Sequence, residues 1–344
     1  MSQRSPFRAF LFAVVFVGFM APVRADEPRT GTEVPAPAGG DAKDKTKDVA
    51  TEDESDGTEF LRYVDDEKHP RLESAIATYR NADGVVVHLV AAVHVGEKSY
   101  YEGLNKTFKG YDALLYEMVK PKNMAAPVRG QRTGSAVSGF QRFLTDVLEL
   151  EFQLDGIDYS APNFVHADLD VETFYKLQEE RGESLLTLML RSMMAQMARA
   201  GQPGGAPPIT IFDILAAMNS PDSARQYKLL FARQFQDIEE QLAGLEGPNG
   251  TVLLTERNKA ALRVLKETIA GGKKNIGVFY GAGHMRGLED ALLEMGFERV
   301  GVQWRLAWDM TAAPTTQPTT KPVVPGLGGA KEKEPAEAGR TGGW

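Results

Sequence analysis

The sequence predicts an α/β fold, a central mixed β-sheet flanked by helices, and three observations predict it. Two short apolar runs lie on either side of residues 97–109, which have a helical composition: residues 85–93, rich in β-branched residues, and residues 111–116. A third apolar run, residues 275–280, passes through a glycine-containing turn into another helical stretch. A strand-helix-strand unit of about 30 residues has parallel strands, so we expect parallel pairing within the sheet.

The two ends of the chain are expected to lie outside the folded domain. Residues 1–25 have arginines ahead of a short apolar run and small residues at the expected cleavage site, which is typical of a secretory signal peptide. Residues 26–58 and 311–344 are rich in charged residues, Pro, Gly and Thr, so we expect a disordered acidic linker and a disordered tail. The folded domain is then residues 59–310.

This organisation predicts a secreted or periplasmic protein. An uncleaved signal is the alternative and the only route to membrane association that we expect, because its apolar run is short for a membrane span. The chain has no cysteine, which excludes a thiol nucleophile and a thiolate metal site. Its formal net charge is −8 and no stripe of Lys and Arg stands out, so nucleic acid is not an expected partner.

The first part of the domain is expected to alternate strands, turns and loops. Residues 72–80 predict a strand, and the turn at residues 81–84 joins it to the first apolar run as an antiparallel hairpin. Residues 162–168 are interpreted as a polar loop, in which we expect His166 and Asp168 to be solvated. The alternative for His166 is a contact with a residue that binds the metal or a contact with substrate.

The second part of the domain is predicted to be largely helical. Residues 171–270 have helical composition almost throughout, Asp170 is suited to cap the first helix, and we expect a helical insertion over about residues 137–271. The methionines of residues 185–200 have helical spacing, which favours a place in the core over an adaptable groove for an apolar peptide or lipid. Residues 300–308 alternate apolar and polar, which predicts a strand with one strongly apolar face.

Polar side chains stand at the ends of three predicted strands. His94 follows the first apolar run, Glu117 ends the second, and His284 follows the third after three small residues. Parallel strands end on one edge of a sheet, where ligands bind in open α/β folds, so we expect these three side chains to converge. Two imidazoles and a carboxylate suit a catalytic divalent metal ion with an open position, and Zn, Mn, Co and Fe all accept this set. When each histidine is considered by itself, a structural role is the alternative to metal binding.

Two further residues sharpen this prediction. His88 shares a strand face with His94, but six residues of strand separate the two by roughly 20 Å, so we interpret His88 as structural. Arg257 falls on the apolar face of a predicted helix, where a guanidinium needs a partner. It is expected to clamp a substrate oxyanion or Glu117, with a snorkelling side chain or an ion pair at the edge of the apolar face as the alternative.

Residues 91–94, 111–117, 256–258 and 281–287 resemble the motifs of the TraB/PrgY/GumN family, which is related to the Tiki metalloproteases and distantly to the erythromycin esterases. The family has two Gly-x-x-His motifs, a glutamate after the second strand and an arginine before the last motif. The chain departs from the first motif, with Ala91 where the family usually has Gly. The resemblance implies a mixed sheet flanked by helices, with a helical region inserted before the final strands. Tiki members are metal-dependent proteases.

These observations predict an exported metal-dependent hydrolase that acts on peptides. His94 and His284 would bind the metal, Glu117 would be the third ligand or the general base, and Arg257 would stabilise developing negative charge. The alternative is a non-catalytic protein of the cell envelope that sequesters a peptide or small ligand. A Ser-His hydrolase fits less well, because the chain has no Gly-x-Ser-x-Gly elbow.

Overall fold

The computed structural model describes the domain with three internal gaps. The described ranges are 59–125, 145–184, 209–237 and 250–312, together with the single residues 187, 190, 191, 194 and 246. The expected signal peptide, the linker, nearly all of the tail and most of the methionine-rich segment lie outside these ranges. Among the described helices, none has both the length and the hydropathy that crossing a membrane requires.

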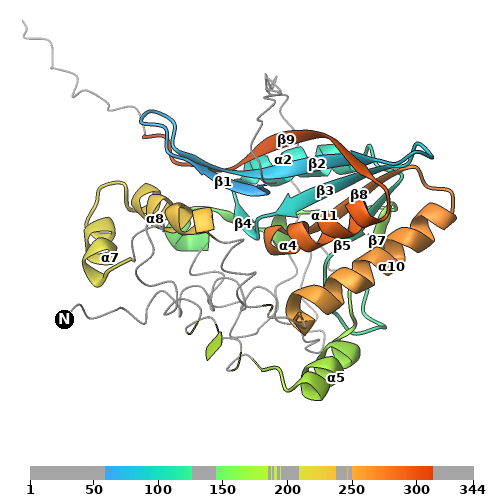
Figure 1. Ribbon diagram of the computed structural model, residues 1–344. Coiled ribbons are helices and arrows are strands. Elements are labelled where there is room, and N and C mark those ends of the chain that lie inside the picture. The colour runs from blue at the N-terminus through green and yellow to red at the C-terminus, as the bar shows by residue number, and fades with distance from the viewer. Residues whose placement is uncertain are drawn as a thin grey trace, which may run out of the picture. The chain divides into compact units, whose positions relative to one another are not determined.

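A mixed seven-stranded sheet lies at the centre of the fold, which confirms the predicted α/β class (Figure 1). Its main path runs in the order β1, β2, β3, β8, β5, β7, and β9 pairs with β2 beside that path. The strands are β1 (Leu61–Val64), β2 (Arg71–Arg80), β3 (Val86–Ala92), β5 (Ala113–Tyr116), β7 (Phe164–His166), β8 (Asn275–Gly281) and β9 (Glu298–Asp309).

One half of the sheet is parallel and positions the candidate site. β8 pairs in parallel with β3 on one side and with β5 on the other, and β5 pairs in parallel with β7. Helix α2 (Lys98–Phe108) connects β3 to β5, so the predicted strand-helix-strand unit is confirmed. β8 comes from the far end of the chain and lies between the two strands of that unit. All four strands therefore end on the same edge.

The other half is antiparallel. β2 pairs with β1 and β3 on one side, which confirms the predicted hairpin, and with β9 along the other. The strand expected over residues 300–308 is also present, but its apolar face is not uniformly buried. Val300 is 53% exposed and Leu306 is 41% exposed, because two register shifts against β2 interrupt the alternation of buried and exposed positions.

The segment expected to be a helical insertion contains strands as well. β7 belongs to the central sheet, and β6 (Glu151–Phe152) pairs with β4 (Val95–Gly96) in a second, two-stranded sheet. The largely helical insertion expected over about residues 137–271 is therefore interrupted by strands in its first part. Its described helices are α4 (Gln153–Gly156), α5 (Val171–Arg181), α7 (Ile211–Met218), α8 (Ser223–Ala232), a short 3-10 turn (Arg233–Asp237), a π-helical turn (Val252–Glu256) and α10 (Arg257–Ala270).

Local sequence explains where several of these helices begin. Asp170 caps α5 as predicted, since its side chain accepts a hydrogen bond of 2.8 Å from the Thr173 amide. Thr251 opens the π-helical turn by accepting from the Leu254 amide at 3.1 Å. After β8, a 3-10 turn (Ala282–His284) leads directly into α11 (Met285–Glu294). His284 thus stands between a buried strand and a helix, as the sequence predicted.

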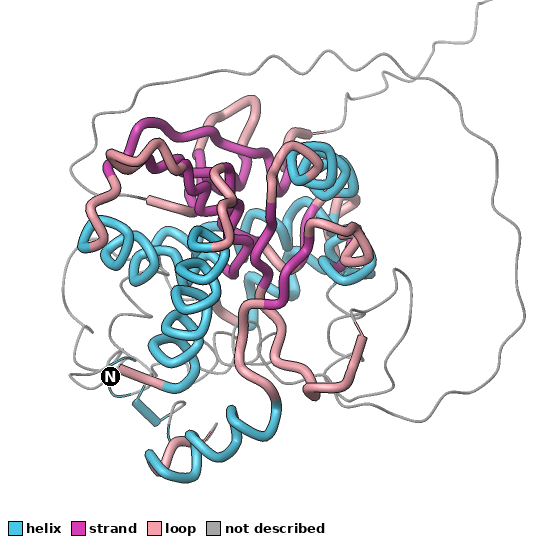
Figure 2. The backbone as a smooth tube through the Cα atoms, turned by 90° about the vertical axis from the view of Figure 1, so that its right-hand side faces the viewer, coloured by secondary structure: helices cyan, strands magenta, loops and turns pink. Residues whose placement is uncertain are grey.

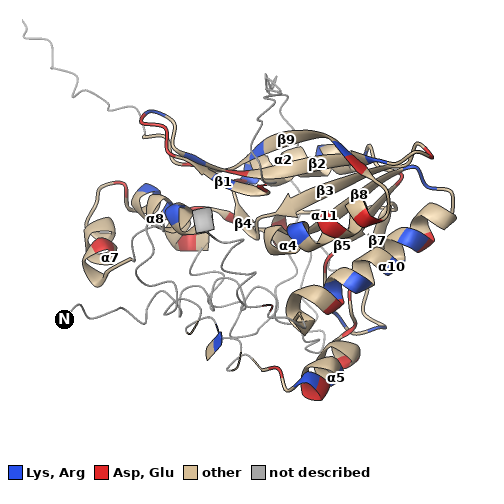
Figure 3. Cartoon of the chain, viewed as in Figure 1, with Lys and Arg blue, Asp and Glu red and all other residues tan. Residues whose placement is uncertain are grey.

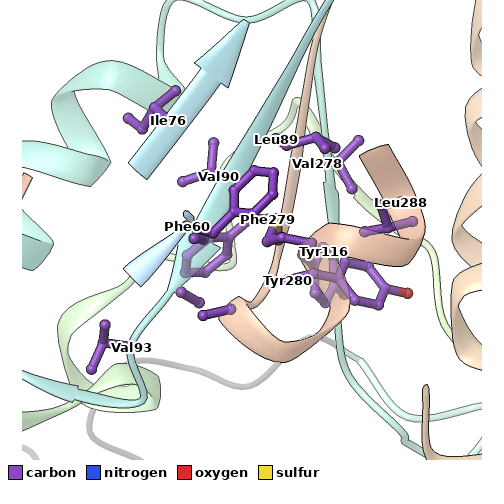
Figure 4. Packing of buried hydrophobic residues seen from close by; sticks show 14 of the residues in the cluster. Phe60, Ile76, Leu89, Val90, Val93, Tyr116, Val278, Phe279, Tyr280 and Leu288 are labelled. Carbon is purple, nitrogen blue, oxygen red and sulfur yellow. The ribbon is translucent and has the colours of Figure 1, made fainter. Parts of the chain in front are cut away.

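The core forms where the helices cover the strands. Figure 2 shows helices on both sides of the strands, and α10 and α11 contact β5 and β3. Phe60, Val90, Phe279 and Leu288 are at most 1% exposed and belong to one cluster of buried hydrophobic residues (Figure 4). On the described elements, charged residues of both signs are interspersed and do not gather by sign (Figure 3). The absence of a nucleic-acid partner stays a prediction.

Candidate functional site

The ends of β3, β5 and β8 bring His94, Glu117 and His284 together, as the sequence predicted. Gly281 donates its backbone N–H to Glu117 Oε2 at 2.5 Å, and His284 Nε2 lies 3.6 Å from Glu117 Oε1. A Cβ atom placed on Gly281 would lie 3.3 Å from both Glu117 Oε2 and His94 Nε2. His284 Nε2 therefore lies near the carboxylate, and His94 Nε2 and the same carboxylate both lie against Gly281 at the end of β8.

Gly281 is required at this position for close approach. Its backbone is in a region open to all residues, so conformational freedom is not the reason. A side chain here would press on the glutamate and on His94 at once, at a distance tighter than most Cβ contacts. The missing Cβ lets the backbone of β8 end against the two functional groups.

Arg257 holds the carboxylate from the helical side. Its Nη2 donates to Glu117 Oε1 at 2.6 Å and to Asp168 Oδ2 at 2.6 Å, and its Nε donates to Asp168 Oδ1 at 3.0 Å. The arginine side chain is 2% exposed, that of Glu117 7% and that of Asp168 0%. The clamp on Glu117 expected for Arg257 is present, and a second carboxylate completes it.

The local sequence explains how Arg257 reaches this position. The π-helical turn before it, capped by Thr251, ends at Glu256, so α10 begins with Arg257 itself. Such turns occur often at functional sites, because the extra residue in the turn re-aims the side chains that follow. The next residue, Asn258, is also buried and contacts His284.

Each histidine is held through Nδ1 by a side-chain amide. His94 Nδ1 lies 2.8 Å from Gln153 Oε1, and His284 Nδ1 lies 2.7 Å from Asn258 Oδ1. His284 Nε2 is buried and has no hydrogen-bond partner within the described ranges. The ring of Tyr280 stands edge-on against His284 at 5.1 Å between centroids.

Burial and charge fix the protonation states of the cluster. Burial raises the pKa of Glu117, but the charge of Arg257, the neighbouring imidazoles and the Gly281 N–H outweigh this effect and lower the pKa to about 2. Burial lowers the pKa of His284 to about 3 and also lowers the pKa of His94. Burial also lowers the pKa of Arg257, but the two carboxylates overcome it and raise the pKa above its ordinary value. With neutral imidazoles, the two carboxylates leave one negative charge in excess over the guanidinium.

The other histidines do not join the cluster. His88 has both ring nitrogens engaged, by Thr78 Oγ1 at 3.0 Å and by Asn275 Oδ1 at 2.8 Å, and it stacks on Tyr111. These contacts agree with the structural role predicted for it. His69 is exposed and contacts Thr311 Oγ1 at 3.4 Å, near the end of the domain.

The prediction that residues 162–168 form a solvated loop is wrong. His166 ends β7, half-buried, with its Nε2 2.6 Å from the Met118 carbonyl oxygen. Asp168, two residues further on, is buried against Arg257. The physical reason is the pairing of β7 with β5, which makes the segment part of the sheet. Asp168 therefore lies at the edge where the parallel strands end.

Sequence reasoning missed Asp168, Gln153 and Asn258 as members of the site. A signal was available for Asp168, because it follows a short β-branched and aromatic run in the same way as Glu117 does. Gln153 is a polar residue flanked by Phe152 and Leu154, which is a weak signal. Within the described ranges, no group of three or more His, Asp or Glu side chains is arranged so that it could hold a metal ion.

Comparison with known proteins adds no relative to this picture: no protein-family model, no curated protein and no solved structure matches the chain.

Proposed function

We propose that this protein is an exported, TraB/GumN-like metal-dependent hydrolase that acts on peptides, with its centre at His94, Glu117 and His284. One observation carries the proposal. Two neutral imidazoles have buried Nε2 atoms at the end of β8, beside one ionised carboxylate that a buried arginine holds in place. The buried cluster has an excess negative charge, and a bound cation compensates such a charge.

The donor set fits a divalent metal ion. Neutral imidazole nitrogen and carboxylate oxygen are common ligands of Zn, Mn, Co and Fe. The buried Nε2 of His284, which has no hydrogen-bond partner in the described part of the chain, is available as a donor. His94, His284 and Glu117 would hold the ion. A divalent ion there supplies Lewis-acid activation for hydrolysis of an amide or ester carbonyl.

Glu117 is better suited to be a ligand than a general base. A general base works best with a pKa near the operating pH, and the pKa of Glu117 is about 2. Its oxygens also accept hydrogen bonds from the backbone N–H of Gly281 and from the guanidinium of Arg257. The carboxylate is therefore fixed in position and charged at neutral pH, which favours cation binding.

Arg257 orients Glu117 and balances charge. Three of its hydrogen bonds go to Asp168 and one to Glu117, so the guanidinium is locked between two carboxylates. Its Nη1 is buried and has no hydrogen-bond partner within the described ranges, which leaves one donor for a developing oxyanion.

The alternative function is a non-catalytic protein of the cell envelope that sequesters a peptide or small ligand. One observation favours it: Nε2 of His94, Nε2 of His284 and Nη1 of Arg257 have almost no surface accessible to solvent. A hydrolase needs substrate to reach these atoms. A binding protein could use the cluster to hold the strand ends together.

The test uses the purified full chain. Elemental analysis measures bound metal, and a peptide library measures cleavage with and without a chelator. Stoichiometric metal and cleavage that the chelator abolishes support the hydrolase. Tight peptide binding without cleavage supports the alternative, and cleavage that the chelator leaves unchanged contradicts the metal-dependent mechanism.

Two glutamate variants make the same test specific to the site. Glu117→Gln removes the carboxylate charge while keeping the size of the side chain, so metal and cleavage should both be lost. Glu73→Gln is the matched control, because Glu73 forms its ion pairs with Arg62 and Arg71, which are not members of the cluster. Equal loss in both variants would point to general damage.

A further inference from the structure

Gln153 and Asn258 contact the two histidines in the same way. Gln153 accepts from His94 Nδ1 through Oε1 and donates its backbone N–H to the His94 carbonyl oxygen at 2.8 Å. Asn258 accepts from His284 Nδ1 through Oδ1 and donates its side-chain N–H to the His284 carbonyl oxygen at 3.2 Å. Each amide residue thus holds both the ring and the backbone of its histidine.

The direction of each side-chain amide fixes the proton on the ring. A carbonyl oxygen only accepts, so the NH₂ group of Asn258 must face the His284 carbonyl and its oxygen must face Nδ1. Gln153 has its NH₂ group 2.8 Å from the Tyr159 hydroxyl, which leaves its oxygen for His94. An amide oxygen cannot donate, so the proton of each neutral ring lies on Nδ1.

From these contacts we infer that Gln153 and Asn258 are positioning residues that hold His94 and His284 as Nδ1-protonated neutral tautomers, with both unprotonated Nε2 atoms at the end of β8, beside Glu117. The inference rests on the proposed function only in its consequence for metal binding. An unprotonated Nε2 is the form of imidazole that binds a metal ion, and the partner on the other nitrogen selects that form.

The fold explains how these two residues reach their places. The two-stranded sheet of β4 and β6 pairs Val95 with Phe152, so Gln153 follows directly beside His94. Asn258 follows Arg257 on α10, so the same turn of helix supplies the residue that contacts Glu117 and the residue that contacts His284. Gly287 leaves room for Asn258, since a Cβ there would lie 2.8 Å from Asn258 Nδ2.

A neutral amide has a specific advantage over a carboxylate in this role. The cluster already contains the carboxylates of Glu117 and Asp168 against one guanidinium. A third or fourth carboxylate would add buried negative charge that nothing in the cluster compensates. The amide selects the tautomer without that charge.

The experiment is NMR spectroscopy of the metal-free full chain with ¹⁵N-labelled histidine, in which two-bond ¹H–¹⁵N correlations identify each tautomer. His94 and His284 should be Nδ1-protonated. His88 and His166 are internal controls of the opposite kind, because their Nε2 atoms face Asn275 Oδ1 and the Met118 carbonyl oxygen. Nε2-protonated His94 or His284 in the wild-type protein overturns the inference, and no variant is needed for that result.

Variants then connect the tautomer to metal binding, with Zn²⁺ alone as the probe. Gln153→Leu and Asn258→Leu should shift the tautomer of the neighbouring histidine and weaken Zn²⁺ affinity about 10- to 100-fold. Gln153→Glu and Asn258→Asp keep an acceptor and should restore the Nδ1-protonated form. An unchanged tautomer in both leucine variants contradicts the positioning role. Correct tautomers in a wild-type protein that binds no Zn²⁺ would overturn the proposed function and leave the inference standing.

Discussion

His88 is half-buried and His284 is buried, and both lie beside β8. They differ in what their second ring nitrogen contacts. His88 has both ring nitrogens hydrogen-bonded to uncharged side chains, Thr78 and Asn275. His284 has Nδ1 hydrogen-bonded to Asn258, whereas its Nε2 lies 3.6 Å from the carboxylate of Glu117. The first arrangement satisfies the ring completely. The second leaves a nitrogen facing a charge, which is the arrangement of a ligand or a proton acceptor.

The comparison extends to the two ends of β8. At its start, Asn275 and its neighbours form a network of neutral groups with one exposed carboxylate, that of Asp112. This carboxylate accepts hydrogen bonds from the backbone N–H groups of Lys274 and Asn275. At its end, ionised groups are buried together. Substitutions at the functional end should therefore have larger effects on stability, on metal binding, or on both.

The largest effect is expected from Arg257→Met. Removing this arginine leaves two buried carboxylates without a countercharge, so the free energy of unfolding should fall by about 3–5 kcal/mol. Arg263 is exposed on the same helix, and Arg263→Met should change stability by less than about 0.5 kcal/mol. Urea denaturation measures both variants. Similar values for the two would show that the buried ion cluster is not important for the fold.

Gly281→Ala should have the next largest effect. The added Cβ would lie 3.3 Å from Glu117 Oε2 and from His94 Nε2, so we expect a loss of about 1–3 kcal/mol in unfolding free energy and weakened metal binding. Gly301→Ala on β9 is the matched control, because a Cβ there meets nothing within 4 Å. Thermal denaturation and a Zn²⁺ titration report the two effects. Full metal affinity in Gly281→Ala would contradict the proposed convergence.

The smallest effect is expected at the start of α5. Asp170→Ala removes the cap of α5 and should reduce the free energy of unfolding by about 1 kcal/mol. Asp170→Asn keeps a capping side chain and should lose less. Bound metal should be unchanged in both variants by elemental analysis, and a loss of metal in Asp170→Ala would mean that α5 supports the site directly.

The sequence predicted the parts of the fold that depend on local patterns. Apolar runs predicted β2, β3, β5, β8 and β9, and helical composition predicted α2 and α11. The place of β8 between β3 and β5 did not follow, because it depends on pairing between residues that are 189 positions apart for β3 and 163 for β5. β4, β6 and β7 have two or three residues each, too few to show a period.

The site residues that follow predicted strands could be identified from the sequence, whereas those in segments interpreted as loops could not. His94, Glu117 and His284 each follow a recognisable apolar run, and Arg257 stands out as a charge on an apolar face. Gln153 and Asn258 are polar residues whose role depends on the histidine beside them, and no pattern in the chain marks that contact. Family membership, export and metal dependence stay predictions.

The most direct test of the account compares His284→Gln with His88→Gln in the full chain. Both changes replace a histidine near β8 with a neutral side chain, and a competitive Zn²⁺ titration against a coloured chelator measures the affinity of each. We expect wild-type affinity in His88→Gln and a loss of more than about 100-fold in His284→Gln, with both proteins folded by circular dichroism. Equal affinity in the two variants would contradict the assignment of His284 as a metal ligand.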